Sequence, residues 1–420
     1  MKNRLIVMNF LEFAAWGSYL TSMGAYLATA GLGTDIGNYY ALQGVVSLFM
    51  PAVMGIVADR WVPAQKLLSF CHLVCAIFMA LAAYIGLSAD GGAVNGTALF
   101  WAYTVSVAFY MPTLALSNSV AYTALDKAGL DTVKAFPPIR VFGTVGFLCA
   151  MWLVDLAGWQ NTPIQFIESA AFSVLLAGYA LTMPECPVGS SDSKKSLLEA
   201  LGLKALTLFK QKKMALFFIF SFLLGVSLQI TNGYANPYIQ SFGDYPEYQG
   251  LFFVEHSNIL ISLSQVSETL CILLIPFFLR RYGIKIVMLI SMLAWVGRFG
   301  FFGLGDPGSV VWLFFLSCIV YGVAFDFFNV SGSLFVDKET DISIRSSAQG
   351  LFMIMTNGLG ATVGSLSAKA IINHYVYAEG LTTIEQASGW QTSWFIFAGY
   401  ALVVAIAFAL LFKYKHIREE

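Results

Sequence analysis

Apolar stretches of about 20 residues recur along almost the whole chain, with short polar loops between them. As a helix, each is long enough to cross roughly 30 Å of hydrocarbon. Transmembrane β-strands would instead give alternating segments of about ten residues. The pattern therefore predicts an all-α polytopic membrane protein with twelve spans, at about residues 5–28, 38–58, 66–88, 97–124, 140–158, 164–184, 214–240, 253–279, 284–305, 309–334, 346–374 and 391–413.

The composition supports this interpretation. Of the 420 residues, 58% are hydrophobic and only 11% are charged, whereas a soluble domain carries about 25% charged residues. The N-terminal stretch "MKNRLIVMNF" has a basic start, and its apolar run continues without a clear cleavage site. It is therefore expected to be the first membrane helix and not a removable signal.

Lysine and arginine are distributed unevenly among the loops. They gather in alternate loops, for example at Arg60, Lys127 and Arg280, and at both chain ends. The opposite loops, such as "GLGTDIG", "SADGGAVNG" and "FGDYPEYQGLF", contain none. By the positive-inside rule, both termini are predicted to be cytoplasmic.

The longest basic loop, about residues 185–213, divides the spans into two groups of six. We expect six-helix bundles at 1–184 and 214–420. Within the loop, "SLLEALGLKALTLF" predicts an amphipathic helix on the cytoplasmic surface; an ordinary solvated linker is the alternative. Its apolar face would hold Leu198, Leu201, Ala205, Leu208 and Phe209.

Six plus six spans with a cytoplasmic linker match the architecture of the major facilitator transporters, whose halves rock around a midplane site. The loop after span two, "GIVADRW", resembles their G-x-x-x-D-R motif through Gly55, Asp59 and Arg60. We expect Gly55 to allow close helix approach and Asp59 to pair with a neighbouring helix in one state only. The corresponding "FLRRYGIK" of the second half lacks the aspartate.

Polar side chains within the spans group at helical spacings. Intramembrane ionisable residues are functional candidates by default, although amides also join helices to one another. Lys369 lies near a span end, where we expect it to snorkel to the interface. The grouped candidates for substrate binding are Arg140, Thr144 and Phe147; Gln229 and Asn232; Gln265 and Glu268; and Tyr321, Phe325 and Asp326.

The chemistry of these groups suits a neutral, planar, hydroxyl-bearing solute. Amides offer donors and acceptors together, and aromatic faces stack on flat rings. An ionised Asp326 within "YGVAFDFFNVSG" would cost roughly 2.5–3.5 kcal/mol at the centre of a lipid-facing helix, so we expect it to face a water-filled cavity. Gly322, one turn earlier, is expected to leave room for a ligand. Asp326 and Glu268 are the proton-coupling candidates, because burial penalises the charged form of a carboxylate.

Other function classes lack their signatures. The sequence contains no H-E-x-x-H metal motif, nucleophile elbow or ATP-binding P-loop, and its four histidines are scattered. Cys71 and Cys75 are one turn apart without a second zinc-spaced pair, so they are interpreted as core residues. We expect neither an enzyme nor a bound cofactor or metal. A transporter of another neutral solute, such as a sugar or drug, and a membrane receptor or intramembrane enzyme stay open at this point.

Several motifs together carry a resemblance that covers nearly the whole chain: "WGSYLTSMGAYL", "MPTLAL", "FPPIRVFGTVGF", "LQITN", "SQVSETL", "RYGIK", "YGVAFDFFNVSGSLFV", "RSSAQG" and "MTNGLG". The chain resembles the nucleoside:proton symporter family of the major facilitator superfamily. The resemblance implies import of purine and pyrimidine nucleosides with a proton, by alternating access, across the bacterial cytoplasmic (inner) membrane. It places all ten grouped candidates at or near the nucleoside site.

The same resemblance implies that the partners are nucleoside, proton and lipid bilayer, without nucleic acid, and we expect a monomer. One residue departs from the pattern. Glu12 stands where we expect glutamine, which leaves the number of titrating carboxylates open.

Overall fold

The computed structural model describes residues 1–89, 91–188, 203–341 and 344–414, and this part of the chain contains helices and no strands. The larger helices are α1 (Lys2–Gly17), α2 (Met23–Thr29), α3 (Ile36–Arg60), α4 (Ala64–Leu87), α5 (Gly96–Tyr110), α6 (Thr113–Lys127), α7 (Thr132–Leu156), α8 (Ile164–Ala180), α10 (Lys212–Gly225), α11 (Ile230–Ser241), α12 (Phe252–Glu255), α13 (Ser257–Leu304), α14 (Val311–Glu339), α15 (Arg345–Met353), α16 (Ala361–Tyr375) and α17 (Thr383–Leu411). Short η segments lie at Gly33–Asp35, Leu203–Lys210, Phe242–Asp244 and Ile354–Gly360, the last a π-helix.

Helical structure occupies all twelve predicted spans. Nine helical segments within the described residues are long and apolar enough to cross a membrane. One of them, α13, contains two predicted spans, and the predicted boundary between these falls at Gly283, where φ is +77°. Glycine suits this position because it adopts positive φ without steric cost.

Several spans expected as single helices are broken. The first one ends as α1 at Gly17 and resumes as α2 at Met23. The seventh ends as α10 at Gly225 and resumes as α11 at Ile230. Non-helical backbone at membrane depth is tolerated where protein or a water-filled cavity surrounds it. Turn hydrogen bonds continue through both breaks, such as Leu20 N–H to the Trp16 oxygen and Ser227 N–H to the Leu224 oxygen.

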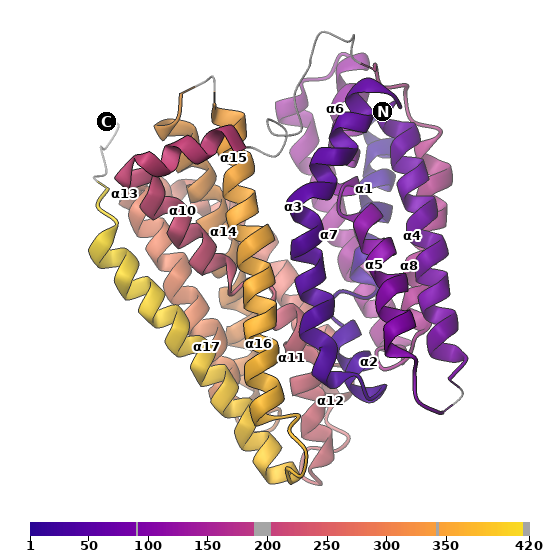
Figure 1. The fold of residues 1–420 in the computed structure, drawn as a ribbon, viewed down its shortest axis with the longest axis vertical. Helices are drawn as coiled ribbons and strands as arrows, with labels where there is room; N and C mark the ends of the chain where they lie inside the picture. The colour runs from indigo at the N-terminus through magenta and orange to yellow at the C-terminus, as the bar shows by residue number, and fades with distance from the viewer. Residues whose placement is uncertain (90, 189–202, 342–343, 415–420) are drawn as a thin grey trace. The chain divides into compact units, whose positions relative to one another are not determined.

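The helices form two compact units (Figure 1). The first contains residues 1–33 and 45–201, and the second contains residues 34–44 and 202–420. Of the amphipathic helix expected in the linker, Leu198 and Leu201 lie outside the described residues. Further along, Ala205 and Leu208 are buried in the η segment Leu203–Lys210, which packs on α10 and α15.

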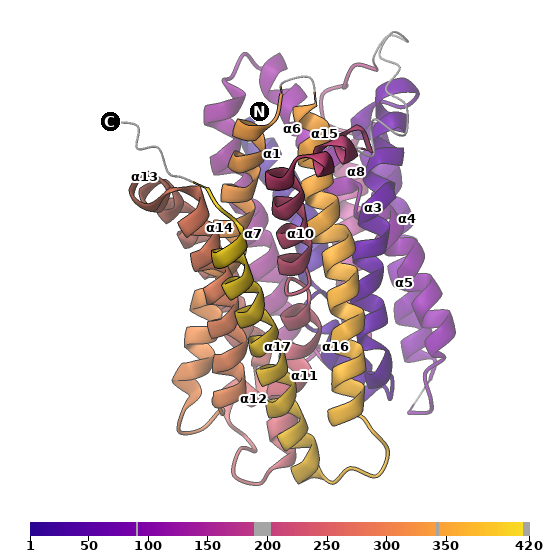
Figure 2. The ribbon, with the colours of Figure 1, turned by 60° about the vertical axis from the view of Figure 1, so that its left-hand side comes forward.

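The outward faces of the helices are apolar, as a lipid environment requires. On α4, exposed Phe70, Leu73, Ile77 and Tyr84 follow one another at helical spacing, while Cys71, Cys75 and Met79 face the interior. The long helix α17 likewise exposes Leu402, Val403, Ile406 and Leu410. Figure 2 shows this helix running along the second unit. The chain is therefore a helical membrane protein.

Candidate substrate and proton site

Two aromatic rings of α14 form a stacked pair in the second unit. The centroids of Tyr321 and Phe325 are 5.8 Å apart, with 14° between their planes. Trp295 on α13 meets Tyr321 edge to face at 5.9 Å, and Phe325 is only half-buried. Offset-stacked and edge-to-face contacts fix ring orientations, so this cluster presents a preformed surface for a planar ring.

Arg298 on α13 contacts the Tyr321 ring of this cluster. It was not among the substrate-binding residues predicted from the sequence. Its guanidinium carbon lies 4.8 Å from the Tyr321 ring centroid. Nη1 donates to Ser264 Oγ at 3.0 Å and to the Ser317 main-chain oxygen at 2.8 Å. A buried arginine signals a functional or positioning role, but sequence spacing does not show that it stacks on Tyr321, because the two lie on different helices.

Asp326 and Glu268 are the predicted proton-coupling pair. Asp326 is only 5% exposed, and its Oδ2 has no hydrogen-bond partner in the described part of the chain. The carboxyl groups of Asp326 and Glu268 interact electrostatically, and Glu268 is half-buried on α13. Two ionised carboxylates in a poorly solvated place repel each other strongly, so the pair is suited to hold a proton.

The expected role of Gly322 is wrong. A Cβ placed on it would lie 2.5 Å from the main-chain oxygen of Ser267, so α13 fills the space that we assigned to a ligand. Gly322 instead lets α13 and α14 approach closely. This approach carries Glu268 next to the helix that holds Asp326.

Two of the three amide candidates, Gln229 and Asn232, lie at the break between α10 and α11. Asn232 Nδ2 donates to Gln229 Oε1 at 2.9 Å, and both side chains are half-buried. Gln265 on α13 is also half-buried, between the buried Ser264 and Ser267. These three amides therefore keep part of their surface available.

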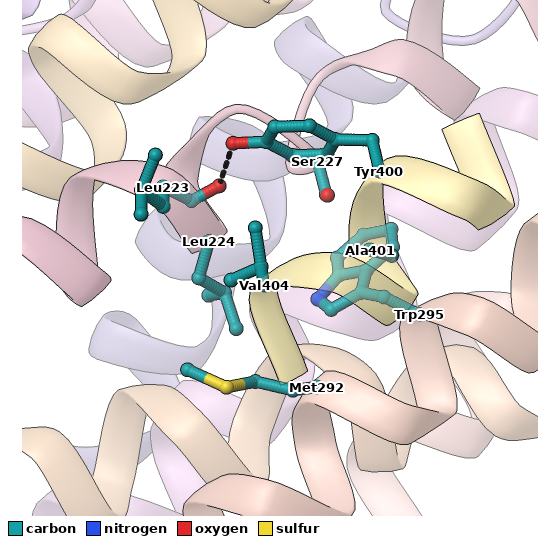
Figure 3. Close-up of a pocket in the computed structure, with 8 residues that line it drawn as sticks. All are labelled: Leu223, Leu224, Ser227, Met292, Trp295, Tyr400, Ala401 and Val404. Atoms are coloured by element: carbon teal, nitrogen blue, oxygen red, sulfur yellow. Dashed lines mark hydrogen bonds between the residues drawn. The ribbon is translucent and has the colours of Figure 1, made fainter. Parts of the chain in front are cut away.

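Figure 3 shows a contact to the last turn of α10, next to the α10–α11 break. The Tyr400 hydroxyl donates to the main-chain oxygen of Leu223 at 2.7 Å. A cavity of about 10 Å³ lies beside it, lined also by Ser227 and Trp295. This volume corresponds to roughly one water molecule, so the cavity is not a nucleoside site. The Trp295 ring that lines it also contacts Tyr321.

The three N-terminal candidates lie on α7 in the first unit. Arg140 is half-buried, with its guanidinium carbon 3.9 Å from the Phe13 ring centroid. Phe147 is buried and meets Trp16 edge to face at 6.2 Å. Thr144 is half-buried on the same helix.

The loop motif is placed at the exposed end of α3. Asp59 and Arg60 are exposed, and Asp59 forms no ion pair with any described residue. The expected close approach at Gly55 is absent in this structure, because nothing lies within 4 Å of a Cβ placed there. The pairing expected of Asp59 in one state only stays a prediction.

Two polar residues have partners that the sequence did not suggest. Lys369 does not snorkel freely; its Nζ lies 3.2 Å from Asp35 Oδ1, which belongs to the same unit. His72 is fully buried, with Nε2 2.9 Å from Glu12 Oε2. His72 lies inside the predicted span 66–88, and a histidine at membrane depth could have been recognised from the sequence as a candidate for a buried polar contact.

Comparison with known proteins decides the family. The family model described as "Nucleoside H+ symporter" matches residues 1–417. The chain belongs to the nucleoside H+ symporter family. As a member, it is a transporter and not an enzyme, which confirms the resemblance seen in the motifs.

Curated relatives of this symporter agree along their full lengths. Xanthosine permease of Escherichia coli (strain K12) is 47% identical over 420 residues, covering 99% of this chain and 97% of the relative. Nucleoside permease NupG of the same organism is 46% identical over 423 residues, covering 100% and 97%.

A solved structure agrees with the fold. The crystal structure of nucleoside transporter NupG superposes on this symporter with a TM-score of 0.89 at 46% identity, covering 99% of each chain. The symporter therefore has the major facilitator fold that the twelve spans predicted.

Proposed function

We propose that this symporter imports purine and pyrimidine nucleosides into the bacterial cell together with protons, by alternating access. It would act as a monomer in the lipid bilayer of the cytoplasmic membrane, with both termini on the cytoplasmic side. The observation that carries the proposal is the cluster in the second unit. There, a stacked Tyr321–Phe325 pair adjoins the carboxyl groups of Asp326 and Glu268.

The cluster supplies the two kinds of contact that a nucleoside needs. The half-buried ring of Phe325 offers a stacking surface worth about 1–3 kcal/mol per base, by analogy with single-stranded nucleic-acid sites. The amides Gln229, Asn232 and Gln265 offer donors and acceptors for base edges and ribose hydroxyls. In the first unit, Arg140, Thr144 and Phe147 supply a further set of the same kinds.

The carboxyl groups suit a proton as the second substrate. A proton that binds between Asp326 and Glu268 removes one of two repelling charges. A proton that moves down a membrane potential of 100 mV provides about 2.3 kcal/mol, which supports a roughly fifty-fold nucleoside gradient. Accumulation of substrate thus requires no ATP site.

Uptake of labelled uridine and adenosine in cells that lack other nucleoside carriers tests the proposal. Uptake should rise as external pH falls below 7 and collapse with a protonophore. Labelled xanthosine belongs in the same panel, because one relative is a xanthosine permease. Undiminished accumulation in protonophore-treated cells would contradict proton symport, and uptake of sugars without nucleosides would favour another solute.

A further inference from the structure

A fully buried hydrogen-bond cluster surrounds Glu12 in the first unit. His72 Nε2 on α4 lies 2.9 Å from Glu12 Oε2, and neither side chain is exposed. Thr113 Oγ1, at the start of α6, lies 2.6 Å from Glu12 Oε1. The Tyr110 hydroxyl donates to the main-chain oxygen of Glu12 at 2.8 Å. Both carboxyl oxygens of Glu12 are therefore engaged.

Thr113 can serve both protonation states of Glu12. Its Oγ1 also lies 2.6 Å from the main-chain oxygen of Tyr110, and a hydroxyl carries one hydrogen. When Glu12 is ionised, Thr113 donates to Oε1. When Oε1 carries a proton, Glu12 donates to Thr113, whose own hydrogen turns to the Tyr110 oxygen. A proton can thus bind or leave while both carboxyl oxygens of Glu12 keep a hydrogen-bond partner.

The surroundings of His72 favour a ring that donates to Glu12 from Nε2. Its Nδ1 is buried and has no partner in the described part of the chain. An imidazolium would bury an Nδ1–H without an acceptor, which is costly. A neutral ring protonated at Nε2 donates to Glu12 Oε2 in both states. The exchangeable proton therefore belongs on Glu12 Oε1.

An ionised Glu12 would be a charge with no exposed surface. A buried charge is costly, and a bound proton removes that cost. Arg140 is the cation nearby and stands over Phe13. Other titratable groups that face the cluster are Cys71 and Cys75 on α4, Tyr110 on α5 and Tyr19 on α1. The helices packed against α1 also carry two buried carboxyl groups, Asp155 on α7 and Glu168 on α8.

Aromatic ring contacts lead from the surroundings of Glu12 to Phe147, a predicted substrate-binding residue. Trp16, one turn after Glu12, lies 5.8 Å from the Tyr110 ring and 6.2 Å from the Phe147 ring. Trp16 Nε1 is buried and has no hydrogen-bond partner among the described residues. A buried donor without a partner is unusual, and a ligand acceptor would satisfy it.

We propose that Glu12, held by His72 and Thr113, is a proton-binding residue of the first unit whose proton is linked to nucleoside binding. This site is additional to Asp326 and Glu268. The inference rests on the proposed function, because nucleoside is the ligand whose binding reports it.

The direct test counts protons taken up when purified protein binds uridine, with a pH indicator in weakly buffered detergent solution. Glu12→Gln can still donate to Thr113 and accept from His72, so it imitates the protonated state. This variant should take up fewer protons per uridine than the wild type, and its affinity should depend less on pH. Glu168→Gln removes another buried carboxyl group of the same unit and should keep the wild-type count. An unchanged count in Glu12→Gln, or an equal loss in Glu168→Gln, would overturn the inference.

Thr113→Val supplies a second test that keeps Glu12 and His72 in place. Hydrogen bonds to charged groups are roughly twice as strong as neutral ones, so removal of the hydroxyl penalises ionised Glu12 more than protonated Glu12. The pH midpoint of uridine binding should therefore rise. An unchanged midpoint would overturn the inference, even if Glu12→Gln could not be purified.

A wrong assignment of Glu12 can be distinguished from a wrong proposed function. Wild-type protein that takes up no proton with uridine would contradict nucleoside–proton symport itself. Wild-type uptake with normal pH dependence in both Glu12→Gln and Thr113→Val would contradict only the assignment of Glu12.

Discussion

The two units each hold a pair of ionisable side chains, and the pairs are of opposite kinds. In the first unit, Glu12 faces an imidazole and a hydroxyl that engage both of its oxygens. In the second, Asp326 faces a second carboxyl group, Glu268, and keeps an Oδ2 without a partner in the described residues.

The difference shows how one fold can use carboxyl groups in two ways. A carboxyl group with complete hydrogen bonds can change its protonation with little rearrangement. A carboxyl oxygen without a partner among the described residues, such as Asp326 Oδ2, gains from any proton or donor that a ligand brings. We therefore expect the second pair to contact both substrate and proton, and the first to bind a proton whose uptake is linked to nucleoside binding.

The largest effect is expected when the second pair is neutralised. Asp326→Asn with Glu268→Gln keeps shape but removes both titrating groups, so pH-dependent accumulation of uridine should be lost. Exchange of labelled for unlabelled uridine, which needs no net proton movement, should survive in Asp326→Asn if its role is proton linkage. If Asp326 mainly holds the ligand, binding should instead be lost at every pH. Normal pH-dependent accumulation by the double variant would shift the proton linkage to the first pair.

The next largest effect concerns the amides at the α10–α11 break and on α13. Gln229→Ala, Asn232→Ala and Gln265→Ala should each weaken uridine binding by about 1–3 kcal/mol, because a ligand group loses its partner. Binding is measured by calorimetry and folding by thermal unfolding.

A matched control for this series lies one turn further along α11. Asn236 is fully buried, accepts from Ser257 Oγ at 2.6 Å and donates to Asn258 Oδ1 at 3.2 Å. Asn236→Ala should lower the unfolding temperature and leave uridine affinity nearly unchanged. If the three candidates behaved like Asn236, they would be interhelical contacts and not substrate ligands.

The membrane spans and the grouped candidates could both be predicted from the sequence. The spans followed from hydropathy alone, because a helix in lipid must satisfy its own backbone within an apolar run. The grouped candidates followed from helical spacing, as Tyr321 and Phe325 show by stacking at i, i+4. Both are properties of one segment, which a sequence records directly.

Contacts between segments distant in the chain could not be predicted in the same way. His72 lies 60 residues from Glu12, and Arg298 lies on a different helix from Tyr321. The contact of Gly322 with the α13 backbone was also missed, since a glycine that leaves room for a ligand and one that admits a helix look alike in sequence. Spacing specifies a face of a helix, but packing decides what that face meets.

A smaller effect is expected from Arg298, whose guanidinium lies over the Tyr321 ring. Arg298→Lys keeps the charge but loses the planar stack on Tyr321 and the fixed donor geometry toward Ser264 and Ser317. Uridine affinity should fall by about 1–2 kcal/mol, through displacement of the Tyr321 ring. Ser264→Ala, which removes one of these acceptors, should have a weaker effect in the same direction. Unchanged affinity in Arg298→Lys would make Arg298 a purely structural residue.

The smallest effect is expected at the ion pair between Lys369 and Asp35. Their side chains are 26% and 46% exposed, and Nζ lies 3.2 Å from Oδ1. Exposed pairs typically contribute about 0–1 kcal/mol, and salt screens them. Asp35→Asn keeps an acceptor for Lys369 and for Asn38, whose Nδ2 donates to Asp35 Oδ1 at 2.9 Å. The unfolding temperature should therefore fall by a few degrees at most, and the difference from wild type should shrink as salt is added. A large loss of stability that salt does not reduce would show that this pair, like Glu12 with His72, acts as a desolvated contact.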